Sequence, residues 1–303
     1  MSSPLVSVIM NCFNGEKYLK RSLDSLVAQK YENFELIFWD NLSNDNSKKI
    51  FQSYNDKRFK YFMSEKHKIL YDARNDALKR CNGKYISFLD TDDFWMNNKL
   101  SSQISVIESN KEIGLIYANY TIHNRNKIFF KKKTLKTKFF KSGKITKHLI
   151  KNYYIGLLTV LIRKEFMKGD LEFFNSKYNL LSDFDYILRF SKKYEIDYIK
   201  ENVAVYNQHD NQLQKKYIQN QAKQFETWFN YNLDNGNLFE SNYDLNNLIN
   251  KIKFLKFSSK IISEKKLSYI RELVFFPNNL YKVKLFLLLL FPERIHKKLL
   301  SFT

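Results

Sequence analysis

Short apolar runs alternate with helical stretches along the first 120 residues of the chain. Five runs rich in β-branched and aromatic residues have the length of buried strands, namely Leu5–Met10, Phe34–Trp39, Phe59–Met63, Tyr85–Leu89 and Gly114–Tyr120. Between them the apolar spacing and capping residues predict helices at Glu16–Gln29, from Asn44 or Asp45 to Tyr54, at Asp72–Arg80, and from Asn97 or Asn98 to Glu108. This alternation predicts an α/β fold with a Rossmann-like, mostly parallel sheet covered by helices.

The pattern weakens after Tyr120. We expect a basic, aromatic strand or hairpin over the site at Phe129–Phe140. Further elements are predicted as helical turns at Thr146–Asn152, a buried strand at Gly156–Ile162, a helix at Ser182–Lys193 and a strand at Asp197–Val205. From Asn211 onward the chain has the pattern of helices. We therefore predict a first domain over residues 1–210 and a helical C-terminal region over residues 211–303.

Polar residues gather where three of the predicted strands end. Asn11 and Asn14 follow the first strand, Asp40 and Asn41 follow the second, and residues 90–93 follow the fourth. In open parallel sheets, ligands bind in the crevice outside the carboxyl ends of the strands. The sequence therefore predicts a ligand site at this edge of the sheet.

The acidic segment Asp90-Thr91-Asp92-Asp93 concentrates three carboxylates in four residues. Their mutual repulsion favours the presence of a cation, and hard divalent ions prefer carboxylate oxygens shared with phosphate. We interpret the segment as a clamp for a metal ion and a diphosphate. The alternative is a turn and helix cap, a task that Asp93 can perform alone.

The formal net charge is +20, and it is unevenly distributed. The segment Arg125–Lys151 holds eleven Lys and Arg residues and no acid, and Lys251–Thr303 has a net charge of +9, so these two segments account for the whole excess. Nucleic acid, anionic lipid or an anionic saccharide would fit such segments. The alternative is that the lysines serve solubility. A hydrophobic fraction of 44% excludes a disordered chain, and two cysteines exclude a disulfide framework and indicate a reducing compartment.

The longest apolar run is the seven-residue stretch Leu285–Phe291, which is closed by Pro292. A membrane-spanning helix needs about 20 apolar residues. Basic residues flank the run on both sides, at Lys282, Lys284, Arg294, Lys297 and Lys298. We predict an interfacial anchor on an anionic membrane, with packing of an ordinary C-terminal helix as the alternative. The N-terminus lacks the pattern of a signal peptide, so we expect a cytoplasmic protein that is peripheral on the inner face of the plasma membrane.

Several motifs occur in one order along the chain, namely residues 4–14 (PLVSVIMNCFN), 15–18 (GEKY), 34–47 (FELIFWDNLSNDNS), 73–75 (ARN) and 83–95 (GKYISFLDTDDFW). The set resembles the family-2 glycosyltransferases of the GT-A fold, especially the bacterial enzymes that build surface polysaccharides. The resemblance is strong over roughly Pro4–Tyr120 and continues more weakly to about Gln212.

The resemblance implies a hexosyl- or N-acetylhexosaminyl-transferase that works by inversion. The donor would be a nucleoside-diphosphate sugar, with a UDP-sugar expected first, and the cofactor would be Mn²⁺ or Mg²⁺. The acceptor would be a saccharide or a lipid-linked saccharide in capsule, O-antigen or lipooligosaccharide synthesis. No nucleic-acid partner is expected. Residues of about 1–120 would bind the nucleotide sugar, and residues of about 121–210 would form the acceptor side.

The resemblance also implies roles for single residues on the donor side. Asp40 would hydrogen-bond the nucleotide base, although Asn41 replaces the second Asp often found in the family. Base and ribose would be lined by Asn11, Phe13 and Asn14. Arg74 would lie near the base and the diphosphate, with a helix-surface arginine as the alternative. The donor would also contact Asp90, toward the ribose, and Thr91, while Asp92 would bind the metal.

Two later segments complete the predicted site. Leu181–Arg189 resembles the family's E-D-x-D-x-x-x-R segment with Ser182 in place of Glu, and Asp183 matches the general base that takes a proton from the acceptor hydroxyl. Asp185 is expected to be structural, paired with Arg189. Tyr206–Gln212 keeps the family's aromatic residue and its histidine, but Asn207 and Gln212 replace Arg and Ser. His209 would bind the metal or the diphosphate, with a structural histidine as the alternative.

Two other function classes compete with this interpretation. A nucleotidyltransferase of related fold would require a glycine-rich phosphate loop near the first strand, where the chain has only Gly15. A non-catalytic protein that binds polyanions such as RNA would use the basic segments and the many aromatic residues. It would leave the ordered acids Asp40, Asp90, Asp92 and Asp183 unexplained.

The basic segment at residues 125–151 has three possible ligands in a glycosyltransferase. It would bind the diphosphate, a lipid-diphosphate acceptor or lipid.

Overall fold

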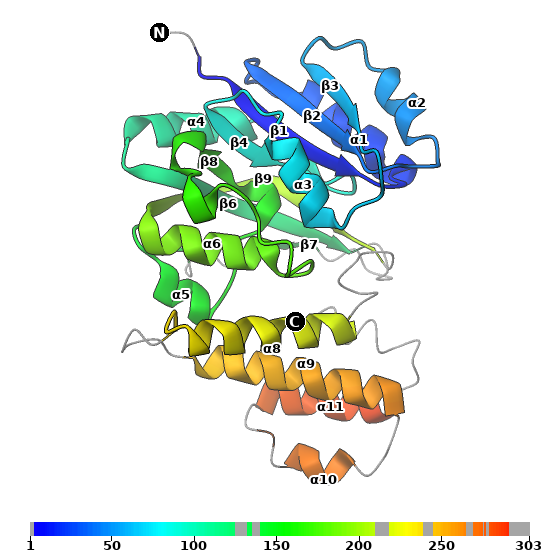
Figure 1. The fold of residues 1–303 in the computed structure, drawn as a ribbon, viewed down its shortest axis with the longest axis vertical. Helices are drawn as coiled ribbons and strands as arrows, with labels where there is room; N and C mark the ends of the chain where they lie inside the picture. Colours follow the sequence, from blue (N-terminus) through cyan, green and yellow to red (C-terminus); the bar gives the residue numbers. More distant parts are fainter. Residues whose placement is uncertain are drawn as a thin grey trace. The chain divides into compact units, whose positions relative to one another are not determined.

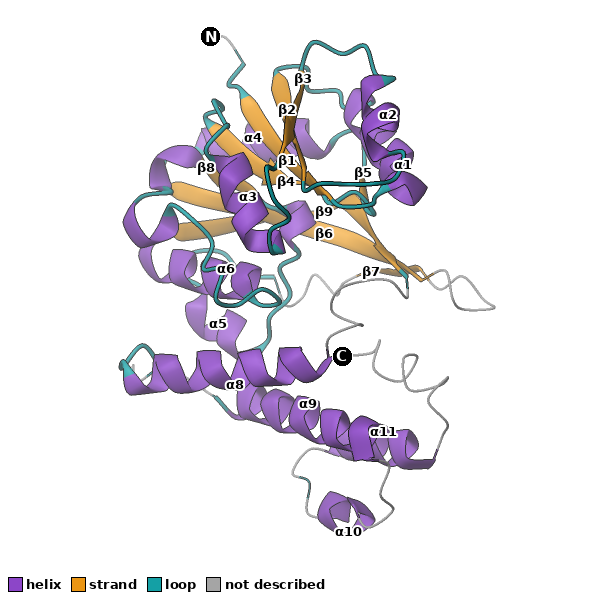
Figure 2. Ribbon diagram, turned by 45° about the vertical axis from the view of Figure 1, so that its right-hand side comes forward, coloured by secondary structure: helices purple, strands orange, loops and turns teal. Residues whose placement is uncertain are grey.

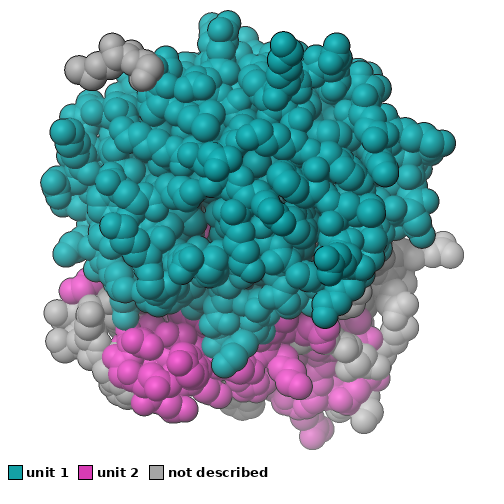
Figure 3. All heavy atoms as spheres, turned by 45° about the horizontal axis from the view of Figure 1, so that its top comes forward, with its two compact units in different colours: residues 1–146, 154–209 teal, residues 147–153, 210–303 magenta. Residues whose placement is uncertain are grey.

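The structure is a computed structural model that describes residues 3–124, 132–134, 140–209, 218–238, 245–264, 269–274, 276 and 279–290. The chain divides into two units, which are coloured separately in Figure 3. Unit 1 comprises residues 1–146 and 154–209, and unit 2 comprises residues 147–153 and 210–303.

A nine-stranded sheet forms the centre of unit 1 (Figure 1). Its strands are β1 (Val6–Cys12), β2 (Phe34–Asp40), β3 (Phe59–Met63), β4 (Tyr85–Phe88), β5 (Phe94–Trp95), β6 (Ile113–Asn124), β7 (Lys132–Thr134), β8 (Leu161–Arg163) and β9 (Glu195–Gln208). The spatial order is β3-β2-β1-β4-β8-β6-β9-β5, and β7 pairs with β6. The four strands β1 to β4 are parallel, and β6 is parallel to β9. The predicted mostly parallel sheet is therefore confirmed, with β5, β7 and β8 as antiparallel additions.

Helices cover both faces of this sheet (Figure 2). They are α1 (Glu16–Val27), α2 (Ser47–Gln52) and α4 (Lys99–Ser109) on one face, and α3 (Leu70–Leu78) and α6 (Ser182–Lys193) on the other. Val6, Val8 and Met10 of β1 pack with Leu19 and Leu23 of α1 in the main core. Because both faces are covered, every residue of β1 and β2 is buried, which explains why these strands are nearly continuous apolar runs.

The predicted strand at Gly156–Ile162 is wrong over its first half. A 3₁₀ turn occupies Leu157–Thr159, and β8 begins only at Leu161. The Thr159 hydroxyl donates to the carbonyl of Gly156 at 2.7 Å, and the Thr159 N–H donates to the same oxygen at 2.9 Å. These local bonds favour the turn over a strand, and hydrophobicity could not separate the two because the turn is buried as well.

The other predicted elements of unit 1 are present, with shifted ends. The strands predicted at Gly114–Tyr120 and Asp197–Val205 extend to the full β6 and β9 and pair along most of their length, with bulges near Asn119. The two-residue strand β5 was too short to predict. Of the expected hairpin at Phe129–Phe140, β7 and Phe140 are described, and the remainder lies outside the described residues.

Unit 2 is helical in its described part, as the sequence predicts. Its helices are α5 (Thr146–Lys151), α8 (Ile218–Asp234), α9 (Asn246–Glu264), α10 (Tyr269–Val274) and α11 (Asn279–Leu290). Asn247 at the start of α9 donates to the carbonyl of Lys151 at 3.1 Å, which ties α5 to this unit. Within the described ranges, none of the helices combines the length and the apolar character that crossing a bilayer requires.

Candidate active site

The loop after β1 brings three of the predicted donor residues to the carboxyl edge of the sheet. Asn11 is buried, and neither polar atom of its side chain has a hydrogen-bond partner among the described residues. Phe13 is 52% exposed, and its ring lies 4.3 Å from that of His67. Asn14 has a positive φ of 53° and accepts a hydrogen bond from the N–H of Asn44 at 2.9 Å. A buried, unpaired amide beside an exposed aromatic ring is suited to a polar, planar ligand.

Asp40 ends β2 and is held rigidly from two sides. One carboxylate oxygen accepts from the N–H of Ser43 at 2.8 Å, and the other accepts from the hydroxyl of Tyr61 at 2.6 Å. Burial and then the bond to Asp40 raise the pKa of Tyr61. The next turn carries Leu42 at a φ of 65°, a strained conformation for a bulky residue. Asp40 is thus a fixed, buried acceptor, and its predicted contact with a base stays a prediction.

The loops after β2 and β3 are joined beside Asp40. Asn41 donates to the carbonyl of Lys68 at 2.7 Å and accepts from its N–H at 3.0 Å. His67 lies 3.1 Å from the carbonyl of Asn41 through Nδ1. The asparagine in place of the family's second aspartate therefore has a structural use, because a carboxylate could not donate to Lys68.

Arg74 is buried inside unit 1, with only 2% of its surface exposed. The alternative of a helix-surface arginine is therefore wrong. Its guanidinium donates to Oδ1 of Asp90 at 2.6 Å and lies 5.0 Å from the centre of the Tyr71 ring. The side chain of Asp90 remains 43% exposed. Arg74 thus fixes an acid that stays open to a ligand, while its own predicted contact with base and diphosphate stays a prediction.

Asp92 and His209 meet at the same edge. Oδ2 of Asp92 lies 2.9 Å from Nε2 of His209, and the imidazole stacks on Tyr18 with 4.7 Å between ring centres. Nδ1 of His209 is buried and has no partner among the described residues. Tyr18 belongs to the GEKY segment, but its stacking role was not predicted.

The remaining residues of the acidic segment, Thr91 and Asp93, contact the surrounding elements of unit 1. Asp93 is buried, and its carboxylate accepts from the N–H of Asn207 in β9 at 2.9 Å. Burial, followed by the charges of Asp92 and Asp90, raises the pKa of Asp93 well above its usual value. Thr91 lies against Gly15, where an added Cβ would meet the threonine Oγ1 at 3.2 Å. Asp93 thus joins the segment to β9 and does not cap a helix, because α4 begins after Asn98, while the side chains of Asp90 and Asp92 stay partly exposed.

The predicted metal ligands can be compared with the side chains that divalent cations prefer. The described residues contain no group of three or more His, Cys, Asp and Glu side chains placed to hold an ion. Asp92 and His209 supply one carboxylate and one imidazole within contact of each other. Mg²⁺ is commonly held by one or two carboxylates, with substrate phosphates and water as the other ligands. The pair therefore fits an ion that is shared with a bound diphosphate.

Asp183 and Asp185 have different environments at the start of α6. Asp183 is partly exposed, and Oδ1 accepts from the N–H of Phe184 at 2.8 Å. Burial raises the pKa of Asp183, while the Phe184 N–H, the charge of Arg74 and the hydroxyl of Tyr71 oppose this rise. Asp185 is buried and accepts from Nε of Arg189 at 2.8 Å. The expected pairing of Asp185 with Arg189 is present, and Asp183 is the more exposed of the two acids.

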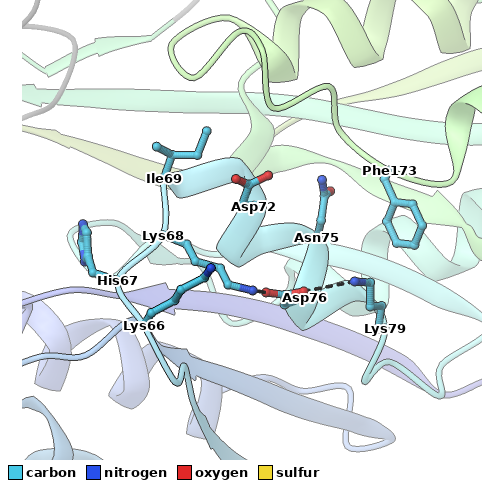
Figure 4. Close-up of a pocket in the computed structure, with 9 residues that line it drawn as sticks. All are labelled: Lys66, His67, Lys68, Ile69, Asp72, Asn75, Asp76, Lys79 and Phe173. Atoms are coloured by element: carbon cyan, nitrogen blue, oxygen red, sulfur yellow. Dashed lines mark hydrogen bonds and ion pairs between the residues drawn. The ribbon is translucent and has the colours of Figure 1, made fainter.

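A separate pocket of about 540 Å³ lies along the outer side of α3 (Figure 4). Its wall includes Asp72, Asn75 and Asp76 of α3 and Phe173. Asp76 binds both Lys68 and Lys79, as the dashed lines in Figure 4 show. None of the predicted site residues lines this pocket.

The fold and the family match together identify the class of protein. The mostly parallel sheet covered by helices on both faces is the architecture of the GT-A fold. The chain matches the glycosyl transferase family 2 domain over residues 7–169. It therefore belongs to glycosyl transferase family 2, and the predicted family is confirmed.

One relative and two solved structures illustrate the similarity. The UDP-Glc:alpha-D-GlcNAc-diphosphoundecaprenol beta-1,3-glucosyltransferase WfgD of Escherichia coli is 40% identical over 54% of this chain and 61% of its own length. The chain thus spans less than two thirds of the length of that relative.

TarS of S. aureus in complex with UDP-GlcNAc is a solved structure with a TM-score of 0.62 and 19% identity, over 96% of this chain and 82% of the other. The mannosyltransferase PcManGT of Pyrobaculum calidifontis, in complex with GDP-Man and Mn²⁺, has a TM-score of 0.58 and 11% identity, over 100% and 87%. Both structures share the fold.

Proposed function

We propose that the chain is an inverting, metal-dependent glycosyltransferase that transfers a hexosyl or N-acetylhexosaminyl group from a nucleoside-diphosphate sugar. The observation that carries the proposal is the separation of roles among the acids of unit 1. Asp90 and Asp92 contact Arg74 and His209, whereas Asp183 lies in the first turn of another helix, α6, where its carboxylate accepts from the N–H of Phe184. Residues 1–210 would form the catalytic domain, and residues 211–303 the helical C-terminal region.

The donor would bind at the carboxyl edge of β1, β2 and β4. The exposed ring of Phe13 and the amides of Asn11 and Asn14 would line the base and ribose, and Asp40 would accept a hydrogen bond from the base. Asp90, held by Arg74, would accept from the ribose, with Thr91 beside it. A UDP-sugar is the first candidate, because the name of the relative WfgD includes UDP-Glc and the TarS structure contains UDP-GlcNAc.

Asp92 and His209 would hold Mn²⁺ or Mg²⁺. The ion would neutralise the charge that develops on the departing diphosphate. The stacking of Tyr18 on His209 would keep the imidazole directed at Asp92. PcManGT was solved with Mn²⁺ in a similar fold, which supports the choice of metal without fixing it.

Asp183 would act as the general base. Its carboxylate would take the proton of an acceptor hydroxyl as that oxygen bonds to the anomeric carbon. The bond between the anomeric carbon and the diphosphate oxygen would break, and its electron pair would leave with the diphosphate. A single displacement of this kind inverts the anomeric configuration. Burial raises the pKa of Asp183, which favours uptake of the acceptor proton by its carboxylate.

The acceptor would be a saccharide or a lipid-linked saccharide of bacterial surface polysaccharide synthesis. WfgD is named for a diphosphoundecaprenol-linked acceptor, which supports a site of action at the inner face of the plasma membrane. Helix α11 supports such a location, because Leu280, Val283, Phe286 and Leu290 are exposed, whereas Leu285 and Leu288 are buried. Helix α11 therefore has an exposed apolar face, and this face would enter the headgroup region of an anionic leaflet, aided by Lys282 and Lys284. Arg294, Lys297 and Lys298 lie outside the described residues.

A donor screen tests the proposal directly. Incubation with UDP-Glc, UDP-GlcNAc or GDP-Man, with and without Mn²⁺, should release the nucleoside diphosphate from one donor only when the metal is present. Membership of family 2 disfavours a nucleotidyltransferase, which would release pyrophosphate instead. Binding of RNA without turnover of any sugar nucleotide would support the non-catalytic alternative.

A further inference from the structure

One face of α1 contacts the segment that carries the proposed metal ligand Asp92. Ser22 on this face is fully buried, and its hydroxyl donates to the carbonyl of Thr91 at 2.7 Å and also to the carbonyl of Asp93. A serine hydroxyl has one proton, so the two carbonyls share it in a three-centre hydrogen bond. Asp92 lies between these two residues. Ser22 thus holds the backbone on both sides of Asp92.

The segment around Asp92 is a tight turn. The N–H of Asp93 donates to the carbonyl of Asp90 at 3.1 Å, which closes the turn over Thr91 and Asp92. Three of these four residues are aspartates, and ionised carboxylates repel one another at such short separations. The shape of the turn therefore depends on contacts with the elements around it, and the hydroxyl of Ser22 supplies one of them.

The same face of α1 also reaches the second proposed metal ligand. Tyr18 lies four positions before Ser22, and residues at this spacing are neighbours on one helix face. The ring of Tyr18 stacks on that of His209, with 4.7 Å between their centres. Nε2 of His209 in turn lies 2.9 Å from Oδ2 of Asp92. One helix face thus contacts His209 directly and Asp92 through its two backbone neighbours.

We propose that Ser22 is a positioning residue for Asp92: its hydroxyl fixes the backbone on both sides of this aspartate, so that the carboxylate stays in contact with His209. The inference rests on the proposed function, in which Asp92 and His209 bind the metal. Serine favours helices less than alanine does, so Ser22 contributes through the contacts of its hydroxyl and not through helix propensity. A ligand that is already in place loses less freedom when the ion and the diphosphate bind.

The first test compares Ser22→Ala with Ser25→Ala. Ser25 is a matched control, because it lies on the same helix and its hydroxyl accepts from the N–H of Trp95 at 3.2 Å, outside the turn that holds Asp92. Calorimetry measures the affinity for UDP with and without Mn²⁺. In Ser22→Ala the Mn²⁺-dependent affinity should fall roughly tenfold, the lower end of the effect of outer-shell changes at metal sites. The affinity without Mn²⁺ should stay unchanged, and Ser25→Ala should change neither value.

A second variant separates positioning from packing. Ser22→Cys nearly keeps the volume of the side chain, but a thiol is a weak hydrogen-bond donor. Its Mn²⁺-dependent affinity should therefore lie between that of Ser22→Ala and that of the unchanged protein. Full affinity in folded Ser22→Ala, or a loss that is equal with and without Mn²⁺, would overturn the proposal. Should Ser22→Ala not fold, Ser22→Cys provides the same comparison with the same expected direction.

Hydrogen exchange in the metal-free protein keeps this inference distinct from the proposed function. The N–H of Asp93 closes the turn, so its exchange rate, followed by NMR, reports how often the turn opens. The rate should rise roughly tenfold in Ser22→Ala, the effect of about one hydrogen bond, and stay unchanged in Ser25→Ala. An unchanged rate in Ser22→Ala would reject the role of Ser22 even if sugar transfer is observed. A faster rate, in a protein whose unchanged form shows no Mn²⁺-dependent binding of UDP, would retain the contact and reject the proposed metal site.

Discussion

Nε2 of His209 lies 2.9 Å from Oδ2 of Asp92, although the two residues are 117 positions apart in the sequence. The contact joins the end of β9 to the segment after β4. A histidine and a carboxylate at this spacing bind each other in the free protein and can share a divalent cation once a diphosphate supplies further oxygens. The fold of unit 1 thus brings together the two side chains that would bind the metal in the proposed function.

Asp92→Asn should abolish metal-dependent binding of a nucleoside diphosphate. Outer-shell changes at metal sites already cost about 10–100-fold in affinity, and loss of a direct ligand should cost no less. Calorimetry with UDP and Mn²⁺ measures the effect, and Asp24→Asn is the control, because Asp24 forms an exposed pair with Lys20. Unchanged affinity in Asp92→Asn would remove Asp92 from the metal site.

Arg74→Met should destabilise the protein and weaken donor binding together. Removal of one partner from a fully buried pair costs about 3–5 kcal/mol, but Asp90 is partly exposed, so we expect roughly 1–3 kcal/mol. Urea unfolding measures the loss of stability. Arg80→Met is the comparison, because Arg80 lies on the exposed side after α3. Equal stability in the two variants would mean that the ion pair with Asp90 contributes nothing net.

Replacement of Leu280, Val283, Phe286 and Leu290 by Ser should reduce binding to anionic liposomes. These side chains are exposed on α11, so the change should leave folding intact. Flotation with vesicles that contain phosphatidylglycerol measures binding. Leu285→Ala is the control, because this buried residue should affect stability and not flotation. Equal flotation of the fourfold variant and the unchanged protein would place the membrane contact elsewhere.

Turnover should fall on acidification at a higher pH than an ordinary aspartate would give. Burial raises the pKa of Asp183, and a base is active only when ionised, so kcat declines as the pH falls through this raised value. Kinetics with saturating donor and acceptor measure the profile. A flat profile down to the usual range of aspartate would contradict the assignment of this acid as the base.

The sheet could be predicted because its central strands are covered on both faces. Residues such as Val8 and Ile9 are both buried although they point to opposite faces, so β1 stands out as an apolar run. Strand β5 could not be predicted, because two residues carry no periodicity. At Leu157–Thr159 we predicted a strand because the residues are apolar and buried, which is equally true of a buried 3₁₀ turn. The hydrogen bond from the hydroxyl of Thr159 to the carbonyl of Gly156 favours the turn that is observed.

Asp40, Asp90 and Asp92 could be predicted from their positions after strands. The side chains that hold the site residues in place could not be predicted. Tyr61 holds Asp40 and Tyr18 stacks on His209 through pairings that exist only after the chain folds. Arg74 was predicted at the site, but its burial and its ion pair with Asp90 could not be predicted, because its surroundings include Phe174, which is far away in the sequence.

In the proposed function, Asp183 performs the chemistry while Asp90 and Asp92 hold the donor. The most direct measurement is sugar transfer by Asp183→Asn, with donor affinity measured on the same sample and Asp185→Asn as the matched variant. Asp183→Asn should bind donor normally and lose at least roughly 10²-fold in transfer. Asp185→Asn should lose stability more than turnover, because it breaks the bond to Arg189. Normal transfer by folded Asp183→Asn, with loss of transfer in Asp185→Asn, would contradict the account and assign the base to Asp185.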